Sequence, residues 1–348
     1  MNKKKVLIFF GGMSTEHEVS RMSATSVLKN IAMDKYDIGV IGIDKDGNFL
    51  EYIGSYEYIV NDDWKKDTRP ISDLIGYIKY YDVAYPVLHG LYGEDGTIQG
   101  LLELLKIPYV GPKVLASSVA MDKVYTKIVY DKAGIKQVPS IYLKEENDKL
   151  ILIDDSFNEI EDKSEIIKRI ENKIGYPAFV KPSNSGSSVG VNKANSKEEL
   201  LEGIKEAKKY DKKILVEKGI NARELECAIL EQNGEVKASV IGEILPAGEF
   251  YSYESKYEDK SSGLAIPADV DKEVSEYIRK TAIKAFKTID ANGLSRVDFF
   301  LDKDTGEIYL NEINTLPGFT NISMYPKLWE KTGIEYSELI DILIENAK

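Results

Sequence analysis

Apolar residues follow two different spacings along the first third of the chain. Short runs rich in β-branched and aromatic residues lie at 6–10, 38–43 and 83–88, and such runs are typical of strands. Between them, the apolar residues of 23–31 and 98–105 recur at helical spacing. Because strands that alternate with helices build βαβ units, the pattern predicts a parallel sheet near the N-terminus.

The middle of the chain predicts two helices, a charged segment and a pair of strands. One helix spans 121–133, and the lysine- and glutamate-rich segment 143–173 after it is expected to be a surface excursion. Residues 178–192 predict two short strands around a loop of glycines and serines. Another helix is expected to start at Ser196, because Ser196 and Glu199 have the capping-box spacing that satisfies free amides.

The last third predicts a packed helix followed by a β-hairpin. Apolar residues recur at helical spacing over 271–290, and Asn292 with Gly293 supplies a stop. Residues 294–313 then predict a strand, a turn at 302–306 and a second strand.

Length and composition indicate more than one domain. A chain of 348 residues that is 43% hydrophobic and 30% charged is larger than one hydrophobic core comfortably serves. We expect an N-terminal substrate-binding α/β domain over 1–120, a central unit over 121–215 and a C-terminal unit over 216–348.

Charge and cysteine content narrow the function classes. With 46 basic and 58 acidic residues the formal net charge is -12, which disfavours nucleic acids and anionic membrane surfaces as partners. The single cysteine, Cys227, excludes a disulfide framework and is expected to be a small buried hydrophobe. Gly11 and Gly12 interrupt the first apolar run well short of a secretory core, and there is no membrane-length apolar segment. We therefore expect a cytoplasmic protein.

Oxygen-bearing side chains gather on the predicted hairpin. Glu312 and Asn314 lie two residues apart on its second strand and share one face, and a turn centred near residue 304 puts Asp298 there too. Oxygen donors without histidine or cysteine suit magnesium, whose shell is normally completed by phosphate oxygens, so the cluster implies a nucleotide. Arg296 would project beside it, available to a developing negative charge.

The alternative interpretation is a charged hairpin that merely faces solvent. Against this alternative, Asn314 runs directly into the tight bend 315–318, and Phe299 and Leu310 make the hairpin too apolar to be peripheral.

Two glycine-containing segments have the composition of ligand-binding loops. Lys181 ends a strand and precedes the loop 186–190, where backbone amides could approach phosphate oxygens while the lysine neutralises charge. Gly11 and Gly12 lead from the first strand to Glu16, at a corner where acids can face amines. Each segment has an ordinary alternative, a flexible turn in one case and a helix cap in the other.

Taken jointly, these segments resemble the D-alanine-D-alanine ligases, a family of the ATP-grasp superfamily. The resemblance spans the chain, and its order and spacing are specific. The matching stretches are GGMSTEHEVS (11–20), HGLYGEDGTIQG (89–100), MDK (121–123), VKPSNSGSSVG (180–190), KY (256–257), SRVDFF (295–300) and NEINTLPGFT (311–320).

The resemblance implies an α/β protein with the ATP-grasp fold: an N-terminal parallel-sheet (Rossmann-like) domain, a central lid domain and a C-terminal α+β domain. It implies ligation of two D-alanine molecules through D-alanyl phosphate for peptidoglycan precursor synthesis. It also implies ATP between two sheets, two Mg²⁺ ions that Mn²⁺ can replace, and a homodimer.

The resemblance further assigns roles to individual residues. Those expected to bind the nucleotide are Lys123 and Lys181 at the phosphates, Glu217, Lys218 and Ile220 at the adenine, Glu224 at the ribose, and Lys256. Those expected to bind Mg²⁺ are Asp298, Glu312 and Asn314. Those expected at the reacting substrates are Glu16 with Ser187 and Tyr257, His89, Arg296, Gly318 and Ser323.

An acyl phosphate must be shielded from water, so a closing lid is expected. The Gly-, Ser- and Tyr-rich segment 248–263 is the candidate, and a plain loop is the alternative. Two positions depart from the family pattern. Residues 221–224 lack a glycine often found beside the ribose contact, and Ile322 stands where many relatives have histidine, next to the second-substrate pocket.

Four other functions are weighed against the ligation of two D-alanines. A D-alanine-D-serine ligase shares the motifs, whereas lactate ligases lose the pair that is present here as Lys256 and Tyr257. A non-catalytic nucleotide-binding regulator should lack the metal ligands or Arg296, and all of them are present. A dinucleotide-dependent oxidoreductase lacks its glycine fingerprint.

Overall fold

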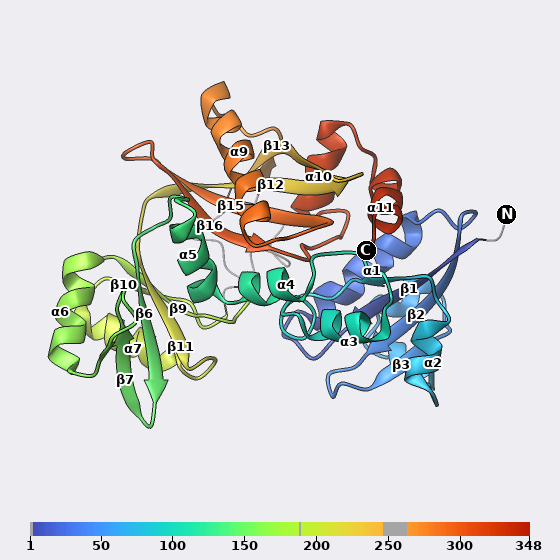
Figure 1. Cartoon of the computed structure of the whole chain (residues 1–348), viewed down its shortest axis with the longest axis horizontal. Coiled ribbons are helices and arrows are strands. Elements are labelled where there is room, and N and C mark those ends of the chain that lie inside the picture. The colour runs from blue at the N-terminus through green and yellow to red at the C-terminus, as the bar shows by residue number, and fades with distance from the viewer. Residues whose placement is uncertain (1–2, 188, 246–262) are drawn as a thin grey trace.

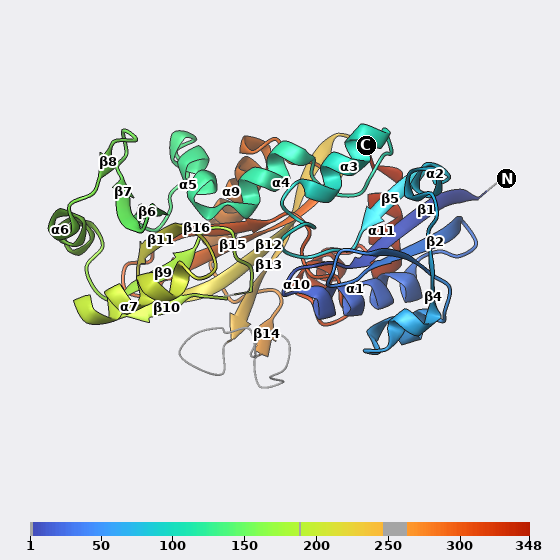
Figure 2. The ribbon, with the colours of Figure 1, turned by 90° about the horizontal axis from the view of Figure 1, so that it is seen from below.

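The computed structural model describes residues 3–187, 189–245 and 263–348, and the statements below refer to these residues. They form three sheets, each built from a continuous part of the chain. Both views show the C-terminal sheet between the other two, with the N-terminal sheet at one end and the central part of the chain at the other (Figures 1 and 2).

Five strands form the N-terminal sheet, in the order β4-β3-β2-β1-β5. They are β1 (Lys4–Gly11), β2 (Tyr36–Ile43), β3 (Phe49–Tyr52), β4 (Thr68–Pro70) and β5 (Val83–Pro86). β1 pairs in parallel with β2 and β5, as predicted, and β3 and β4 add an antiparallel edge that the pattern did not predict.

Alternate side chains of β1 enter two different cores, because successive residues of a strand point to opposite faces. Val6, Ile8 and Phe10 pack with the helices α1 (His17–Asn30) and α11 (Tyr336–Glu345). Leu7 and Phe9 pack with residues of α2 and α3. The remaining helical elements of this region are η1 (Tyr56–Val60), η2 (Trp64–Asp67), α2 (Leu74–Lys79) and α3 (Thr97–Leu105).

Six strands form the central sheet, in the order β10-β9-β11-β6-β7-β8. They are β6 (Ser140–Glu146), β7 (Lys149–Ile153), β8 (Glu159–Ile160), β9 (Ala178–Pro182), β10 (Asn192–Ala194) and β11 (Lys213–Lys218). The prediction of a surface excursion over 143–173 is wrong. Most of that segment is β6, β7 and α6 (Lys163–Lys173), whose Ile166, Ile167 and Ile170 are buried beneath a charged outer face.

Two helices beside this sheet begin at capping residues. Ser196 caps α7 (Lys197–Ala207), with its hydroxyl accepting the Glu199 amide at 3.2 Å. The helix predicted over 121–133 is α5 (Lys123–Lys132), preceded by α4 (Val114–Met121). It starts at Lys123 because Asp122 has an extended backbone and its carboxylate accepts the first free amides.

Five strands form the C-terminal sheet, in the order β14-β13-β12-β15-β16. They are β12 (Ala222–Gln232), β13 (Glu235–Leu245), β14 (Gly263–Ala265), β15 (Leu294–Asp302) and β16 (Ile308–Asn314). The predicted packed helix is α9 (Lys272–Thr288), which buries Ile278, Ala282 and Phe286 against this sheet, and α10 (Met324–Thr332) follows the hairpin. The predicted hairpin is confirmed as β15 and β16.

Cys227 is buried in this sheet as expected, and burial raises its pKa to about 12.

None of the described helices combines the length and the apolar character needed to cross a membrane. The chain passes from the central to the C-terminal sheet between Lys218 and Ala222, whereas the domain boundary expected near residue 215 falls inside β11. The division into domains stays a prediction.

Candidate active site

A cleft of about 1580 Å³ lies where the three sheets approach one another. It brings together every predicted site residue that the structure describes. These are Glu16, His89, Lys123, Lys181, Ser187, Glu217, Lys218, Ile220, Glu224, Arg296, Asp298, Glu312, Asn314, Gly318 and Ser323. Lys256, Tyr257 and nearly all of the candidate lid lie outside the described residues.

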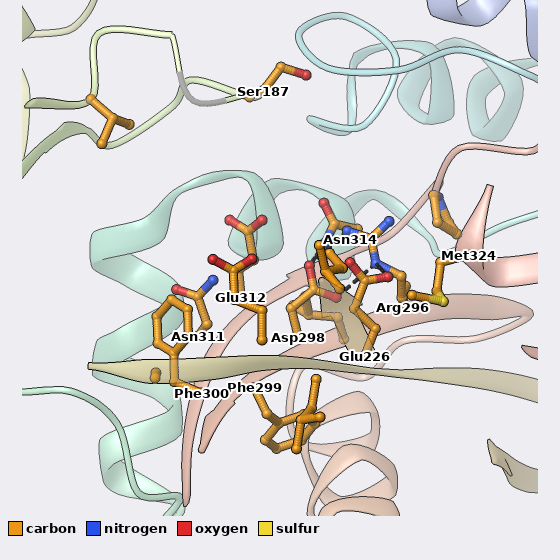
Figure 3. Close-up of a pocket in the computed structure, with 18 of the residues that line it drawn as sticks. Ser187, Glu226, Arg296, Asp298, Phe299, Phe300, Asn311, Glu312, Asn314 and Met324 are labelled. Carbon is orange, nitrogen blue, oxygen red and sulfur yellow. Dashed lines mark hydrogen bonds and ion pairs between the residues drawn. The ribbon is translucent and has the colours of Figure 1, made fainter. Parts of the chain in front are cut away.

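Three carboxylates stand in register on the floor of this cleft. Glu226 of β12 pairs with Asp298 of β15, which pairs with Glu312 of β16, and we call these three the acid row. Figure 3 shows their side chains on one side of the sheet, with Phe299 on the opposite side. The predicted shared face of Asp298, Glu312 and Asn314 is thus confirmed, and the Asn314 amide donates to Asp298 Oδ2 at 2.9 Å.

Arg296 is held inside the acid row. Its Nε and Nη2 donate to the two Asp298 oxygens at 2.8 and 2.7 Å, and Nε also lies 2.8 Å from Glu226 Oε2. Burial lowers the pKa of Arg296, but Asp298 and Glu226 outweigh it and raise that pKa well above its ordinary value. The sequence suggested a guanidinium simply available to developing charge. Here two carboxylates fix its position instead.

The donor set at this floor fits a hard cation. Asp298, Glu312 and Asn314 offer oxygen atoms only, the ligands that Mg²⁺ prefers. In the described part of the chain, no group of three or more His, Cys, Asp and Glu side chains could hold a metal by itself. Two carboxylates and an amide therefore suit an ion whose other ligands come from phosphate oxygens.

The opposite side of the cleft carries buried lysines around one carboxylate. Lys181 Nζ of β9 lies 2.5 Å from one oxygen of Glu217, and Lys127 Nζ of α5 lies 2.7 Å from the other. We call Lys127, Lys181 and Glu217 the lysine cluster. Burial raises the pKa of Glu217, but Lys127 and Lys181 outweigh that effect and lower the pKa to about 2.

Lys123 connects the loop after β9 with the acid row. Its Nζ donates to the backbone oxygen of Ser185 at 2.8 Å and lies 3.7 Å from Glu312 Oε2. Because Lys123 and Lys127 are four residues apart on α5, both project from one face of that helix. Lys123 lines the cleft, whereas Lys127 lies buried behind it against Glu217.

The Glu16 side chain lines the cleft and does not cap α1. Ser187 Oγ donates to Glu16 Oε1 at 2.5 Å, and among the described residues the Glu16 side chain makes no capping bond to α1. A Cβ at Gly90 or at Gly186 would lie 2.6 Å from Glu16 Oε2. A side chain at either position would displace the Glu16 carboxylate, and Gly90 also has a positive φ of 71°, which favours glycine.

His89 and Ser23 hold the bend after β16. His89 Nδ1 faces the Leu316 carbonyl at 2.9 Å and must donate to it, so Nε2 accepts from Ser23 Oγ at 2.9 Å. Ser23 Oγ in turn accepts the Phe319 amide at 3.1 Å. Burial lowers the pKa of His89, which favours this neutral form. Both ring nitrogens are thus used by the protein, and direct substrate contact by His89 stays a prediction.

The remaining predicted positions surround the same bend. Ser323 Oγ accepts the Thr320 amide at 3.0 Å, and a Cβ at Gly318 would lie 3.0 Å from that hydroxyl. Ile322 is 63% exposed at the cleft, so it offers an apolar surface there.

Comparison with known proteins identifies the family of this chain. The family described as D-ala D-ala ligase N-terminus matches residues 5–112, and that described as D-ala D-ala ligase C-terminus matches residues 129–345. The chain is 56% identical to the D-alanine--D-alanine ligase of Clostridium acetobutylicum, over 99% of this chain and 98% of that protein. It is 53% identical to the ligase of the same name from Clostridium novyi, with the same shares covered.

The chain belongs to the D-alanine-D-alanine ligase family.

Two solved structures of D-alanine ligases share its fold. The VanG D-Ala:D-Ser ligase of Enterococcus faecalis aligns with a TM-score of 0.85 and 37% identity, over 99% of both chains. The D-alanine-D-alanine ligase of Coxiella burnetii aligns with a TM-score of 0.85 and 35% identity, over 99% of this chain and 94% of that one. The expected ATP-grasp fold is therefore confirmed.

Three further residues in or directly behind this ligase's cleft were not predicted from the sequence, namely Glu94, Lys127 and Glu226. Glu226 could have been found, since it lies two residues after Glu224 and so on the same strand face. Lys127 was hidden in a helix read only for its apolar spacing. Glu94 lies in the stretch 89–100, where it accepts the Gly90 amide at 2.9 Å. Burial and the nearby Glu16 carboxylate raise the pKa of Glu94 to about 8.

Proposed function

We propose that this chain joins two molecules of D-alanine in an ATP-dependent reaction, through a D-alanyl phosphate intermediate, for peptidoglycan precursor synthesis. The observation that carries the proposal is the meeting, in one cleft, of the acid row, of Lys181 and Glu217 from the lysine cluster, and of the Glu16–Ser187 pair. The high identity to proteins named D-alanine--D-alanine ligase supports the choice of substrate.

The nucleotide would lie between the central and C-terminal sheets. Lys123 and Lys181 would neutralise its phosphates, while Glu217 and the chain at Lys218 and Ile220 would receive the adenine. Glu224, on β12, would face the ribose, and Lys256 is expected to contribute from outside the described residues. The position of these side chains around one cleft supports this arrangement.

Asp298, Glu312 and Asn314 would hold Mg²⁺, with two ions, or Mn²⁺ in their place, expected from the family resemblance. When bound, the metal supplies positive charge to the phosphate oxygens. Arg296 stays anchored by Glu226 beside these ligands, so its guanidinium remains directed at the reacting centre.

In the first step, a carboxylate oxygen of one D-alanine bonds to the terminal phosphorus of ATP, the bond to the bridging oxygen breaks, and ADP leaves. In the second, the amine of the other D-alanine bonds to the acyl carbon, loses a proton, and inorganic phosphate leaves. Glu16, held by Ser187, would grip the ammonium of the first D-alanine. Arg296 would stabilise the negative charge of the tetrahedral intermediate.

The second D-alanine would bind by the bend after β16, near Gly318 and Ser323. Ile322 gives this end of the cleft an apolar surface, which supports a small apolar side chain over a hydroxymethyl group. A D-serine acceptor is the second candidate, because the VanG structure titled as a D-Ala:D-Ser ligase shares the fold equally well. An added hydroxyl is difficult to exclude by pocket size alone, so the choice needs measurement.

The decisive assay incubates purified protein with magnesium-ATP and D-alanine, alone or with D-serine or D-lactate, and measures phosphate and product. We expect D-alanyl-D-alanine in equal amount to the phosphate released. A turnover with D-serine equal to that with D-alanine would contradict D-alanine as the preferred second substrate. Phosphate release without dipeptide or depsipeptide would contradict the proposed ligation.

The use of ATP supports the cytoplasmic location that the sequence predicts. A homodimer is expected from the family resemblance, and analytical ultracentrifugation of the purified protein checks it.

A further inference from the structure

Lys127 is a buried cation whose ion-pair partner among the described residues is Glu217, and its Nζ also donates to the Val138 carbonyl at 3.4 Å. Its side chain is only 10% exposed and that of Glu217 only 7%, with 2.7 Å between Nζ and Oε1. The backbone around Lys127 is fixed as well, since it lies within α5 and its carbonyl accepts the Gln137 side chain at 2.9 Å. The helix therefore holds the Lys127 backbone beside Glu217, and burial leaves its ammonium little access to solvent.

Lys181 is placed differently although it contacts the same carboxylate. It is the penultimate residue of β9 and lines the cleft, and besides Glu217 it is attracted to Glu312 and Glu224. In the proposed function Lys181 also serves the phosphates of the nucleotide. Attraction to those phosphates weakens its hold on Glu217, and a buried carboxylate without a cation would take up a proton.

The protonation state of Glu217 decides which base it can recognise. An ionised carboxylate can only accept hydrogen bonds, so it suits the exocyclic amine of adenine and repels the carbonyl of a 6-oxopurine. A protonated carboxyl can donate a hydrogen bond to that carbonyl, so it no longer discriminates adenine from a 6-oxopurine.

We propose that Lys127 keeps Glu217 ionised while Lys181 serves the phosphates, and thereby selects a 6-aminopurine nucleotide over a 6-oxopurine nucleotide. Lys127 is thus a positioning residue that acts through Glu217. The inference rests on the proposed function, in which Glu217 receives the adenine.

The test compares the dissociation constants of ATP and inosine triphosphate, measured by calorimetry with magnesium, for wild type and Lys127→Met. We expect ATP affinity to fall by about tenfold or more, because a charged hydrogen-bond acceptor is lost, and the preference for ATP over inosine triphosphate to fall by a similar factor. The KM for D-alanine should stay within about twofold. Lys127→Arg keeps the charge and should restore most of the preference.

Lys132→Met is the matched control, because Lys132 is exposed on the same helix and should leave both nucleotides unaffected. If Lys127→Met does not fold, Lys127→Met combined with Glu217→Gln removes the unpaired buried charge. The combined variant should match Glu217→Gln alone in its preference between the nucleotides.

An unchanged preference in folded Lys127→Met, or equal weakening of both nucleotides, would overturn the inference. So would a further loss of preference when Lys127→Met is added to Glu217→Gln. A wild-type protein that binds neither nucleotide would instead refute the proposed function, and the inference with it. If the wild type binds ATP but Lys127→Met has unaltered selectivity, only the inference fails and the proposed function stands.

Discussion

The two sides of the cleft handle buried charge in opposite ways. On the floor, the acid row places three carboxylates side by side, two of which hold one guanidinium, so negative charge is in excess. On the other side, the lysine cluster gathers two ammonium groups around one carboxylate, so positive charge is in excess. A cation and a polyphosphate between them would complete both sets. The comparison shows that each side of the cleft carries an excess of one charge, which a bound ligand of the opposite charge would balance.

The largest expected effect comes from breaking the acid row at its centre. Asp298→Asn should lower the turnover of dipeptide synthesis by about 10³-fold, because the variant loses a metal ligand and a carboxylate that fixes Arg296. Asp271→Asn, at the exposed start of α9, is the control and should keep full turnover. Turnover of Asp298→Asn within about tenfold of wild type would contradict the role of the acid row.

Breaking the lysine cluster at Lys181 should lower turnover less. Lys181→Ala should lower turnover by about 10²-fold or more through the lost phosphate contact, yet leave the protein folded. Folding should survive because Lys127 still neutralises Glu217. Steady-state kinetics and thermal unfolding measure the two effects. Near-normal turnover would refute the phosphate role.

A third change separates the two roles of the acid row, which are metal binding and the anchoring of Arg296. Glu226→Gln removes one partner of Arg296 and leaves the predicted metal ligands in place, so turnover should fall by about tenfold while the KM for ATP stays constant. A rise in that KM without loss of turnover would place Glu226 with the nucleotide instead.

A fourth change tests the region between the two sides. Gly186→Ala places a methyl group 2.6 Å from Glu16 Oε2 and should raise the KM for the first D-alanine several-fold. Gly100→Ala is the control, since no described atom lies within 4 Å of its added Cβ. An unchanged KM in Gly186→Ala would show that Glu16 is not close to the substrate ammonium.

The smallest expected effect is on stability. The pKa of Glu94 is raised from 4.5 to about 8, so between those values the folded state keeps a proton that the unfolded state has lost. The free energy of unfolding should therefore fall as pH rises through this window. Glu94→Gln removes this titration and should reduce the fall by about 1 kcal/mol or more, as measured by urea unfolding. Identical pH profiles in both proteins would contradict a buried, protonated Glu94.

The two sides also differ in how far the sequence could predict them. Asp298, Glu312 and Asn314 lie within one short hairpin, where a spacing of two residues fixes the shared face. Lys127, Lys181 and Glu217 come from α5, β9 and β11, and only the tertiary fold brings them together. The sequence singled out Lys181 by its loop, but Lys127 lies in a helix whose buried face had been recognised only by its apolar residues.

Composition misled the sequence analysis at one place for a related reason. The segment 143–173 is rich in lysine and glutamate, yet Leu143, Leu152 and Ile166 are buried in the central core. Charged residues on the outer face of β6 and α6 concealed the spacing of the inner ones. The stretch 248–262, with Lys256 and Tyr257, lies outside the described residues, and its role as a lid stays a prediction.

The central claim is that this cleft transfers a phosphoryl group to a carboxylate before the amide bond forms. The most direct test supplies D-alanine labelled with ¹⁸O in its carboxylate and analyses the inorganic phosphate by mass spectrometry. The account predicts that each phosphate released during dipeptide synthesis carries one labelled oxygen from the carboxylate. Phosphate without label would contradict it.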